Sequence, residues 1–173
     1  VNASIEFGVR GLMFNGSDEK FRSDLNYRPG FRLWDSSFSI KPVSGKKSFF
    51  DVLQVKASGW GADPSGFVRV GMDKAGAYRM DATVRQVNLI NRVSNLALGY
   101  HPSDTRRNFG DFDLTIFPES QKLRLRFGAS FNKTGGNRGS STRTRDVFPI
   151  VENLDSEAGD IRAGVDTKLA GFK

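Results

Sequence analysis

The residues of this chain that could do chemistry are arginines and aspartates that recur at every second position. Asp111 and Asp113 are separated by one residue, and so are Arg124 and Arg126. Successive side chains of a β-strand point to opposite faces, so each such pair lies on one face. Charges gathered on one face of a sheet can set the ion selectivity of a pore or grip a plug protein. The candidates for this face are Arg69, Asp81, Arg85, Asp111, Asp113, Arg124 and Arg126.

Catalytic chemistry has little support. Residues 101–104 place His101, Ser103 and Asp104 close together, but a catalytic triad is assembled from distant positions with a defined geometry. The chain has no cysteine and a single histidine, which excludes thiol catalysis, a disulfide framework and His-rich metal sites. We therefore predict that the protein is not an enzyme and uses no cofactor.

A second group of charges lies in a segment rich in Gly, Ser and Thr. Lys133, Arg138, Arg143 and Arg145 fall within residues 132–146, where we expect a loop. This loop either binds a polyanion such as lipopolysaccharide or an acidic partner, or is only a solvated loop. No aromatic residue alternates with its cations, and the +7 net charge of the chain is scattered, so we expect no nucleic-acid partner.

Strands are the elements that must position these charges. Ile5, Phe7 and Val9 alternate with polar or small residues, which is the period of a strand with one apolar face. No run of 18 apolar residues exists, so the sequence contains no transmembrane helix. Further expected strands cover residues 31–40, with an interruption at 35–37, then 52–58, 67–72, 78–84, 111–117, 122–131 and 161–169, giving about eight in all; polar loops are expected at 15–20 and 58–66.

The first of two short hairpins joins residues 67–72 to 78–84 through a five-residue loop. Closing it with Met72 opposite Tyr78 sets Val70 against Met80 and Arg69 against Asp81. Every residue then has a chemically suitable partner.

The second hairpin joins residues 111–117 to 122–131 through a four-residue loop. Its favoured register pairs Leu114 with Leu125 and Phe112 with Phe127, and places Asp113 opposite an arginine, Arg126. A slip of one residue would set charges against apolar side chains, which disfavours it.

Two all-β folds are compatible with this alternation: a transmembrane barrel and a soluble β-sandwich. Residues 123–131 keep one face apolar over nine positions, and a transmembrane strand needs about 9 to 11. Long connections at about 86–108 and 132–159 alternate with the short turns, as in outer-membrane barrels. In the first connection Val84, Val87, Ile90 and Val93 recur every three residues, which fits either a strand or a short helix. We expect an antiparallel up-and-down transmembrane β-barrel, with the sandwich as the alternative.

Several segments resemble one family of bacterial outer-membrane proteins. They are residues 21–27, the Ser58-Gly59-Trp60-Gly61 segment with Asp63-Pro64, Tyr78-Arg79, and residues 111–115. They look like the N-terminal part of the decahaem-cytochrome-associated outer-membrane proteins. The resemblance implies a barrel that sheathes a multihaem cytochrome. The chain has no haem-attachment motif, so any haem would belong to the partner, and it lacks the cysteine pair of some members.

The prediction from sequence is therefore residues 1–173 as one antiparallel β-barrel region, incomplete at its C-terminal side. Its expected location is the bacterial outer membrane, in contact with lipid, and its expected role is that of a pore, scaffold or sheath. A soluble β-sandwich module that binds carbohydrate or an acidic partner is the alternative function. In the barrel the charged positions face the interior; in the sandwich they only solubilise an outer face.

Overall fold

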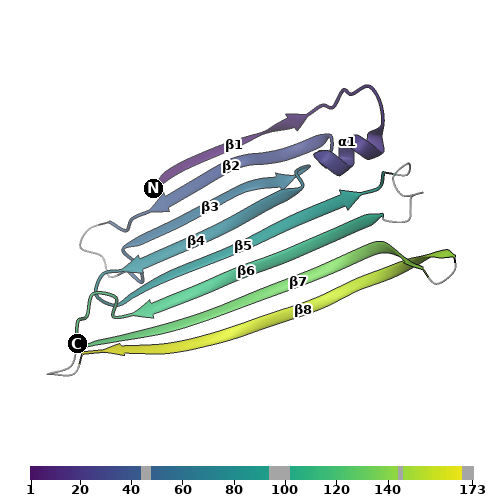
Figure 1. Ribbon diagram of the computed structural model, residues 1–173. Helices are drawn as coiled ribbons and strands as arrows, with labels where there is room; N and C mark the ends of the chain where they lie inside the picture. Colours follow the sequence, from purple (N-terminus) through teal and green to yellow (C-terminus); the bar gives the residue numbers. More distant parts are fainter. Residues whose placement is uncertain (44–47, 94–101, 144–145, 169–173) are drawn as a thin grey trace.

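The computed structural model describes residues 1–43, 48–93, 102–143 and 146–168, and these form one antiparallel sheet with a short helix. The eight strands lie side by side in the order of the chain (Figure 1). The elements are β1 (Asn2–Arg10), α1 (Asp18–Asp24), β2 (Gly30–Ile40), β3 (Val52–Gly61), β4 (Ser65–Lys74), β5 (Tyr78–Asn91), β6 (Ser103–Ile116), β7 (Leu123–Arg143) and β8 (Val147–Thr167).

The all-β, antiparallel, up-and-down prediction is confirmed, as is the expected number of strands. The described strands form a single sheet, in contrast to the two facing sheets of a sandwich. The sheet is open, because within the described residues β1 pairs only with β2 and β8 only with β7. The first and last strands lie at opposite edges in Figure 1.

One face of the sheet is apolar through its middle; we call it the apolar face. The cross-strand register aligns its side chains in rows that run from β2 to β8. Three neighbouring rows contain no charged residue: Ile40, Leu53, Met72, Met80, Leu114, Phe127 and Ala163; Phe38, Val55, Val70, Ala82, Phe112, Ala129 and Ile161; Ser36, Ala57, Val68, Val84, Gly110, Phe131 and Gly159.

This face has almost no cover. Ile90 is a buried hydrophobic residue, whereas Phe7 is 63% exposed and Ile161 is 89% exposed. A soluble monomer rarely leaves a contiguous apolar surface of this extent in water. The described sheet therefore lacks a core of its own.

The strands lengthen along the sheet. β1 to β4 have 9 to 11 residues, β5 and β6 have 14, and β7 and β8 have 21. The additional residues of β5 to β8 extend toward the end where α1 lies (Figure 1). They carry polar residues on both faces, such as Asn88, Arg106 and Lys133 on the side of the apolar face. Beyond the apolar rows, β6 and β7 thus have the composition of a water-exposed ribbon, whereas the start of β8 exposes Phe148, Ile150 and Val151.

Both predicted hairpin registers are wrong by two residues. In the first, Met72 pairs with Met80 and Lys74 with Tyr78, because a three-residue turn with Gly76 at φ 69° closes the hairpin more tightly than expected. In the second, Leu125 pairs with Ile116, because residues 117–122 form a wider loop in which Phe117 has φ 57°. A shift of two keeps every side chain on its predicted face, which is why alternation could not detect it.

Several predicted loops are strands. Residues 132–143 continue β7, and residues 147–159 belong to β8, so the expected loop at 132–146 is wrong over residues 132–143. Val84 to Ile90 lie in β5, which decides against the short helix, and the predicted loop at 58–66 is reduced to residues 62–64 between β3 and β4. β2 is continuous through residues 35–37; its irregularity is a bulge at Trp34.

The expected polar loop at 15–20 also contains a helix. Ser17 caps α1 by accepting a hydrogen bond from the backbone N–H of Lys20, and Asp18 and Glu19 lie in the first turn, where acidic residues favour the helix dipole. The segment packs against β5, where Asn26 donates to the carbonyl of Asn88 at 3.0 Å. No helix in the described residues is long and apolar enough to cross a membrane.

Candidate functional site

The face opposite the apolar rows carries the predicted charges; we call it the charged face. Its central row aligns Gln54, Gly71, Asp81, Asp113, Gly128 and Arg162 across six strands. The rows on either side are Lys56, Arg69, Thr83, Asp111, Ser130 and Asp160, and Asp73, Arg79, Thr115, Arg126 and Gly164. Arg85 and Arg124 lie on the same face at its two margins, so all seven candidates share the surface predicted for them.

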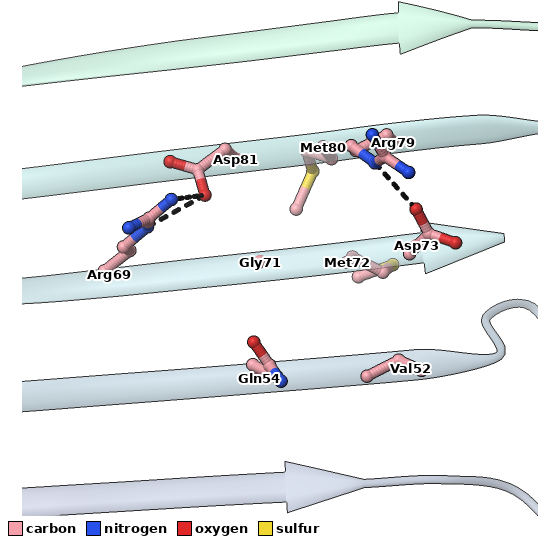
Figure 2. A pocket seen from close by; sticks show the side chains of 9 residues that line it. All are labelled: Val52, Gln54, Arg69, Gly71, Met72, Asp73, Arg79, Met80 and Asp81. Atoms are coloured by element: carbon pink, nitrogen blue, oxygen red, sulfur yellow. Dashed lines mark hydrogen bonds and ion pairs between the residues drawn. The ribbon is translucent and has the colours of Figure 1, made fainter. Parts of the chain in front are cut away.

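The best-defined part of the charged face is a groove over β3, β4 and β5. Two ion pairs flank it: Arg69 with Asp81, at 2.7 Å from Nη2 to Oδ2, and Arg79 with Asp73, at 2.9 Å from Nε to Oδ2. Figure 2 shows the two pairs on either side of Gly71, which has no side chain to fill the space between them. The groove has a volume of about 630 Å³.

The Arg69–Asp81 contact was predicted from a register that the structure does not have. In the observed register Arg69 lies opposite Thr83 and Asp81 opposite Gly71. The two side chains still meet because they are diagonal neighbours on one face, a separation that long side chains can bridge.

The predicted pair between Asp113 and Arg126 does not form. Arg126 contacts Asp166 of β8 at 2.5 Å, and Arg124 approaches the same carboxylate at 3.9 Å. Asp113 instead approaches Arg162 at 3.8 Å. The two-residue shift of the β6–β7 register moved Thr115 to the position opposite Arg126, which left this arginine to the β8 carboxylate.

Two cation–π contacts lie at the margin of the charged face that Arg85 marks. The Arg85 guanidinium lies over the Phe109 ring at 6.0 Å, and the Arg107 guanidinium lies over the same ring at 5.1 Å. Arg107 also donates through Nε to Asn132 Oδ1 at 2.7 Å. Within the described residues neither arginine forms an ion pair, and Asp111 in the adjacent row also has none.

The predicted basic loop is part of the long β7–β8 hairpin. Lys133 contacts Glu157 at 3.3 Å, and Arg138 lies in register with Glu152. The backbone of Arg143 ends β7, and Arg145 lies outside the described residues. Lys133 and Arg138 therefore each face an acidic residue of β8, and both lie in a strand instead of the expected loop.

The His-Ser-Asp cluster is tested only in part, because His101 lies outside the described residues. Ser103 begins β6, and Asp104 forms an ion pair with Arg92 at 2.7 Å. In the described part of the chain no group of three His, Cys, Asp or Glu residues is placed to hold a metal ion.

Sequence reasoning missed half of the ion-pair partners. Within the described residues, the charged face's pairs are completed by five residues that were not candidates: Asp73, Arg79, Asp160, Arg162 and Asp166. The signal was available for β8, because Arg162 and Asp166 alternate with Ile161, Ala163 and Val165 just as the candidates alternate on β6 and β7.

We compared the chain with protein-family models, curated proteins and solved structures. None of them matches it.

Chemically, the charged face is a polar surface that carries charges of both signs. Like charges are neighbours within a strand, as Asp111 and Asp113 are on β6, while the ion pairs of Arg69, Arg79 and Arg126 join opposite charges on different strands. These pairs are largely exposed, and exposed pairs contribute about 0 to 1 kcal/mol each, so they add little to stability. They instead keep the face hydrated and present both signs of charge to whatever lies against it.

Proposed function

We propose that this chain forms part of the wall of a bacterial outer-membrane β-barrel and acts passively as a pore, scaffold or sheath. In this arrangement the apolar face contacts lipid and the charged face lines the interior. The antiparallel, sequentially ordered sheet is the architecture that such barrels use.

The observation that carries the proposal is that the apolar and the charged residues of β7 occupy opposite faces of the same stretch of the strand. On β7 the apolar face runs from Leu123 to Phe131, nine residues, and a tilted transmembrane strand needs about 9 to 11. Behind it, at the same height, stand Arg124, Arg126 and Ser130. A sheet apolar on one side and charged on the other over one bilayer thickness suits a wall between lipid and water.

The open edges are consistent with this role only if the sheet is closed in the membrane. Unpaired backbone groups in hydrocarbon cost several kcal/mol each. β1 and β8 must therefore be paired, either with each other or with further strands. Sheathing of a multihaem cytochrome, as the family resemblance implies, is the most specific form of the proposal, and the charged face would then contact the partner.

The test is a heat-modifiability gel of the native protein from fractionated bacterial membranes, run with and without boiling in detergent. A closed barrel stays folded in detergent at room temperature and changes mobility after boiling. We expect a shift, confined to the outer-membrane fraction. A protein that appears in the soluble fraction and does not shift would overturn the proposal in favour of a soluble binding module.

A further inference from the structure

Arg85 of β5 and Arg107 of β6 both contact one aromatic ring, that of Phe109. Their guanidinium groups lie over Phe109 at 6.0 and 5.1 Å, within the range of a cation–π contact. Register and alternation place all three residues on the charged face, where Arg85 lies opposite Phe109. Asn132 of β7 accepts a hydrogen bond from Nε of Arg107 at 2.7 Å and fixes the orientation of that side chain.

These two arginines differ from the others on the charged face because no carboxylate neutralises them. Arg69, Arg79, Arg126 and Arg162 each form an ion pair, whereas Arg85 and Arg107 form none within the described residues. Asp111, in the adjacent row, contacts neither of them. Both guanidinium groups lie within 6.0 Å of one ring centroid, so an anion beside that ring would be attracted by both.

We propose that Arg85, Arg107 and Phe109 form a binding site for a small oxyanion, of which inorganic phosphate is the representative. Guanidinium groups bind phosphate through pairs of parallel N–H···O bonds, and phosphate has enough oxygens to accept from two of them at once. Because Nε of Arg107 is already occupied by Asn132, its Nη groups are the donors that remain for the anion. The site goes beyond the proposed function, since it depends on the geometry of the sheet and not on insertion into a membrane.

The experiment is equilibrium dialysis of the full chain, folded in detergent micelles, against radiolabelled inorganic phosphate at constant ionic strength. The wild type should bind one phosphate per chain with saturation. Arg107→Gln should weaken binding by about tenfold or more, because it removes a charged hydrogen-bond donor to the anion. Arg107→Lys should keep part of the affinity, since the charge remains while the planar fork is lost.

The matched control is Arg106→Gln. Arg106 is the next residue of the same strand, but it points to the opposite face and donates to Asn88 at 3.1 Å. The Arg106→Gln variant removes the same charge from the chain as Arg107→Gln does, and it should leave phosphate binding at the wild-type level. Equal losses in the two glutamine variants would show nonspecific attraction by net charge and would overturn the site, as would absence of saturable binding by the wild type. Circular dichroism of each variant verifies that the sheet is intact.

The outcome can be separated from that of the proposed function. A chain that shows the heat-dependent shift but binds no phosphate would lose only this site. A chain that binds phosphate in the expected pattern but shows no shift would keep the site and lose the barrel.

Discussion

Asp113 of β6 and Arg162 of β8 approach each other at 3.8 Å across the strand that separates them. The residue between them in register is Gly128 of β7. A Cβ at this position would lie 3.0 Å from Asp113 Oδ1 and 2.9 Å from Arg162 Nε. The missing side chain is therefore what allows an ion pair to span three strands of the charged face.

Replacing Gly128 by Ala should break this contact at little cost in stability. The atoms in the way belong to side chains that can move, and an exposed ion pair contributes at most about 1 kcal/mol, so we expect a loss below that figure. The comparison is Gly59→Ala. Gly59 has φ 74°, and a Cβ there would collide with the backbone carbonyl of Ser65, so the loss should be about 2 kcal/mol or more. Urea unfolding in detergent micelles measures both; equal losses would contradict this interpretation of Gly128.

The observed register of the first hairpin can be tested by cross-linking, since the chain has no native cysteine. In the pair Met72→Cys and Met80→Cys the two residues face each other in register, so oxidation should form a disulfide efficiently. In the pair Val70→Cys and Met80→Cys, the register expected from sequence, the residues are two positions out of register and should react poorly. Mass spectrometry after mild oxidation quantifies both yields, and a higher yield in the second pair would restore the register expected from sequence.

This register shows where sequence reasoning succeeded and where it failed. Alternation of apolar and polar residues assigns a face to each strand residue, and all seven charged candidates lie on the predicted face. A shift of two residues conserves that alternation, so the partners depend on turn geometry instead. The turn at Gly76 closes one hairpin more tightly than predicted, and the loop at Phe117 closes the other more widely.

The length of the strands was underestimated for a related reason. The end of β7 lies beyond the apolar rows, where both faces are accessible to water. Without one apolar face, the period of two disappears from the sequence, and a Gly- and Ser-rich strand has the composition of a loop. The pairing with a neighbouring strand, which sequence alone does not show, keeps these residues extended.

Placing a charge on the apolar face should prevent insertion into a membrane. Leu125→Arg introduces a guanidinium on the apolar face, between Ile116 and Val165 in the row next to the uncharged rows. An arginine on the lipid face of a barrel costs up to about 2 to 4 kcal/mol, the most at the bilayer midplane. Ser130→Arg is the matched control, because it adds the same side chain to the charged face of the same strand, beside Asp160. We expect the first variant, and not the second, to lose folding into lipid vesicles as followed by the heat-dependent gel shift. Failure of both variants alike would argue against a lipid-facing role for Leu125.

Asp63 should be far more important to stability than another carboxylate with two arginine partners. It contacts Arg10 at 3.1 Å and also pairs with Arg32, and the side chains of Asp63 and Arg32 are 11% and 3% exposed. Removing one partner of a buried pair leaves an uncompensated charge, so Asp63→Asn should cost about 3 kcal/mol or more. Asp166→Asn provides the comparison: Asp166 also contacts two arginines, Arg124 and Arg126, but it is half exposed and its loss should cost about 1 kcal/mol or less. Denaturant unfolding of the two variants measures both losses in the free energy of unfolding. Similar losses would show that burial of the carboxylate is not the deciding factor.

The final prediction concerns the response to acid of the turn between β4 and β5. Asp51 accepts a hydrogen bond from Lys74 Nζ at 2.7 Å and another from the backbone N–H of Ala75 at 2.9 Å. The bond from Lys74, followed by the bond from Ala75, lowers the pKa of Asp51 below its ordinary value. Because the pKa in the folded state is the lower one, the stabilisation is fully present above the unfolded pKa of about 3.9. It is lost as the pH falls through the folded pKa.

Asp51→Asn should therefore be less stable than the wild type at pH 6, and the difference should shrink as the pH falls below about 4. Urea unfolding of both proteins across that range measures the effect, and NMR titration of the Asp51 carboxyl carbon reports the pKa directly. Lys74→Gln provides the second variant: it removes the larger cause of the shift, so the pKa of Asp51 should rise toward its ordinary value. A stability difference that stays constant from pH 6 to pH 3 would show that the Asp51 contacts stabilise the turn without depending on its charge.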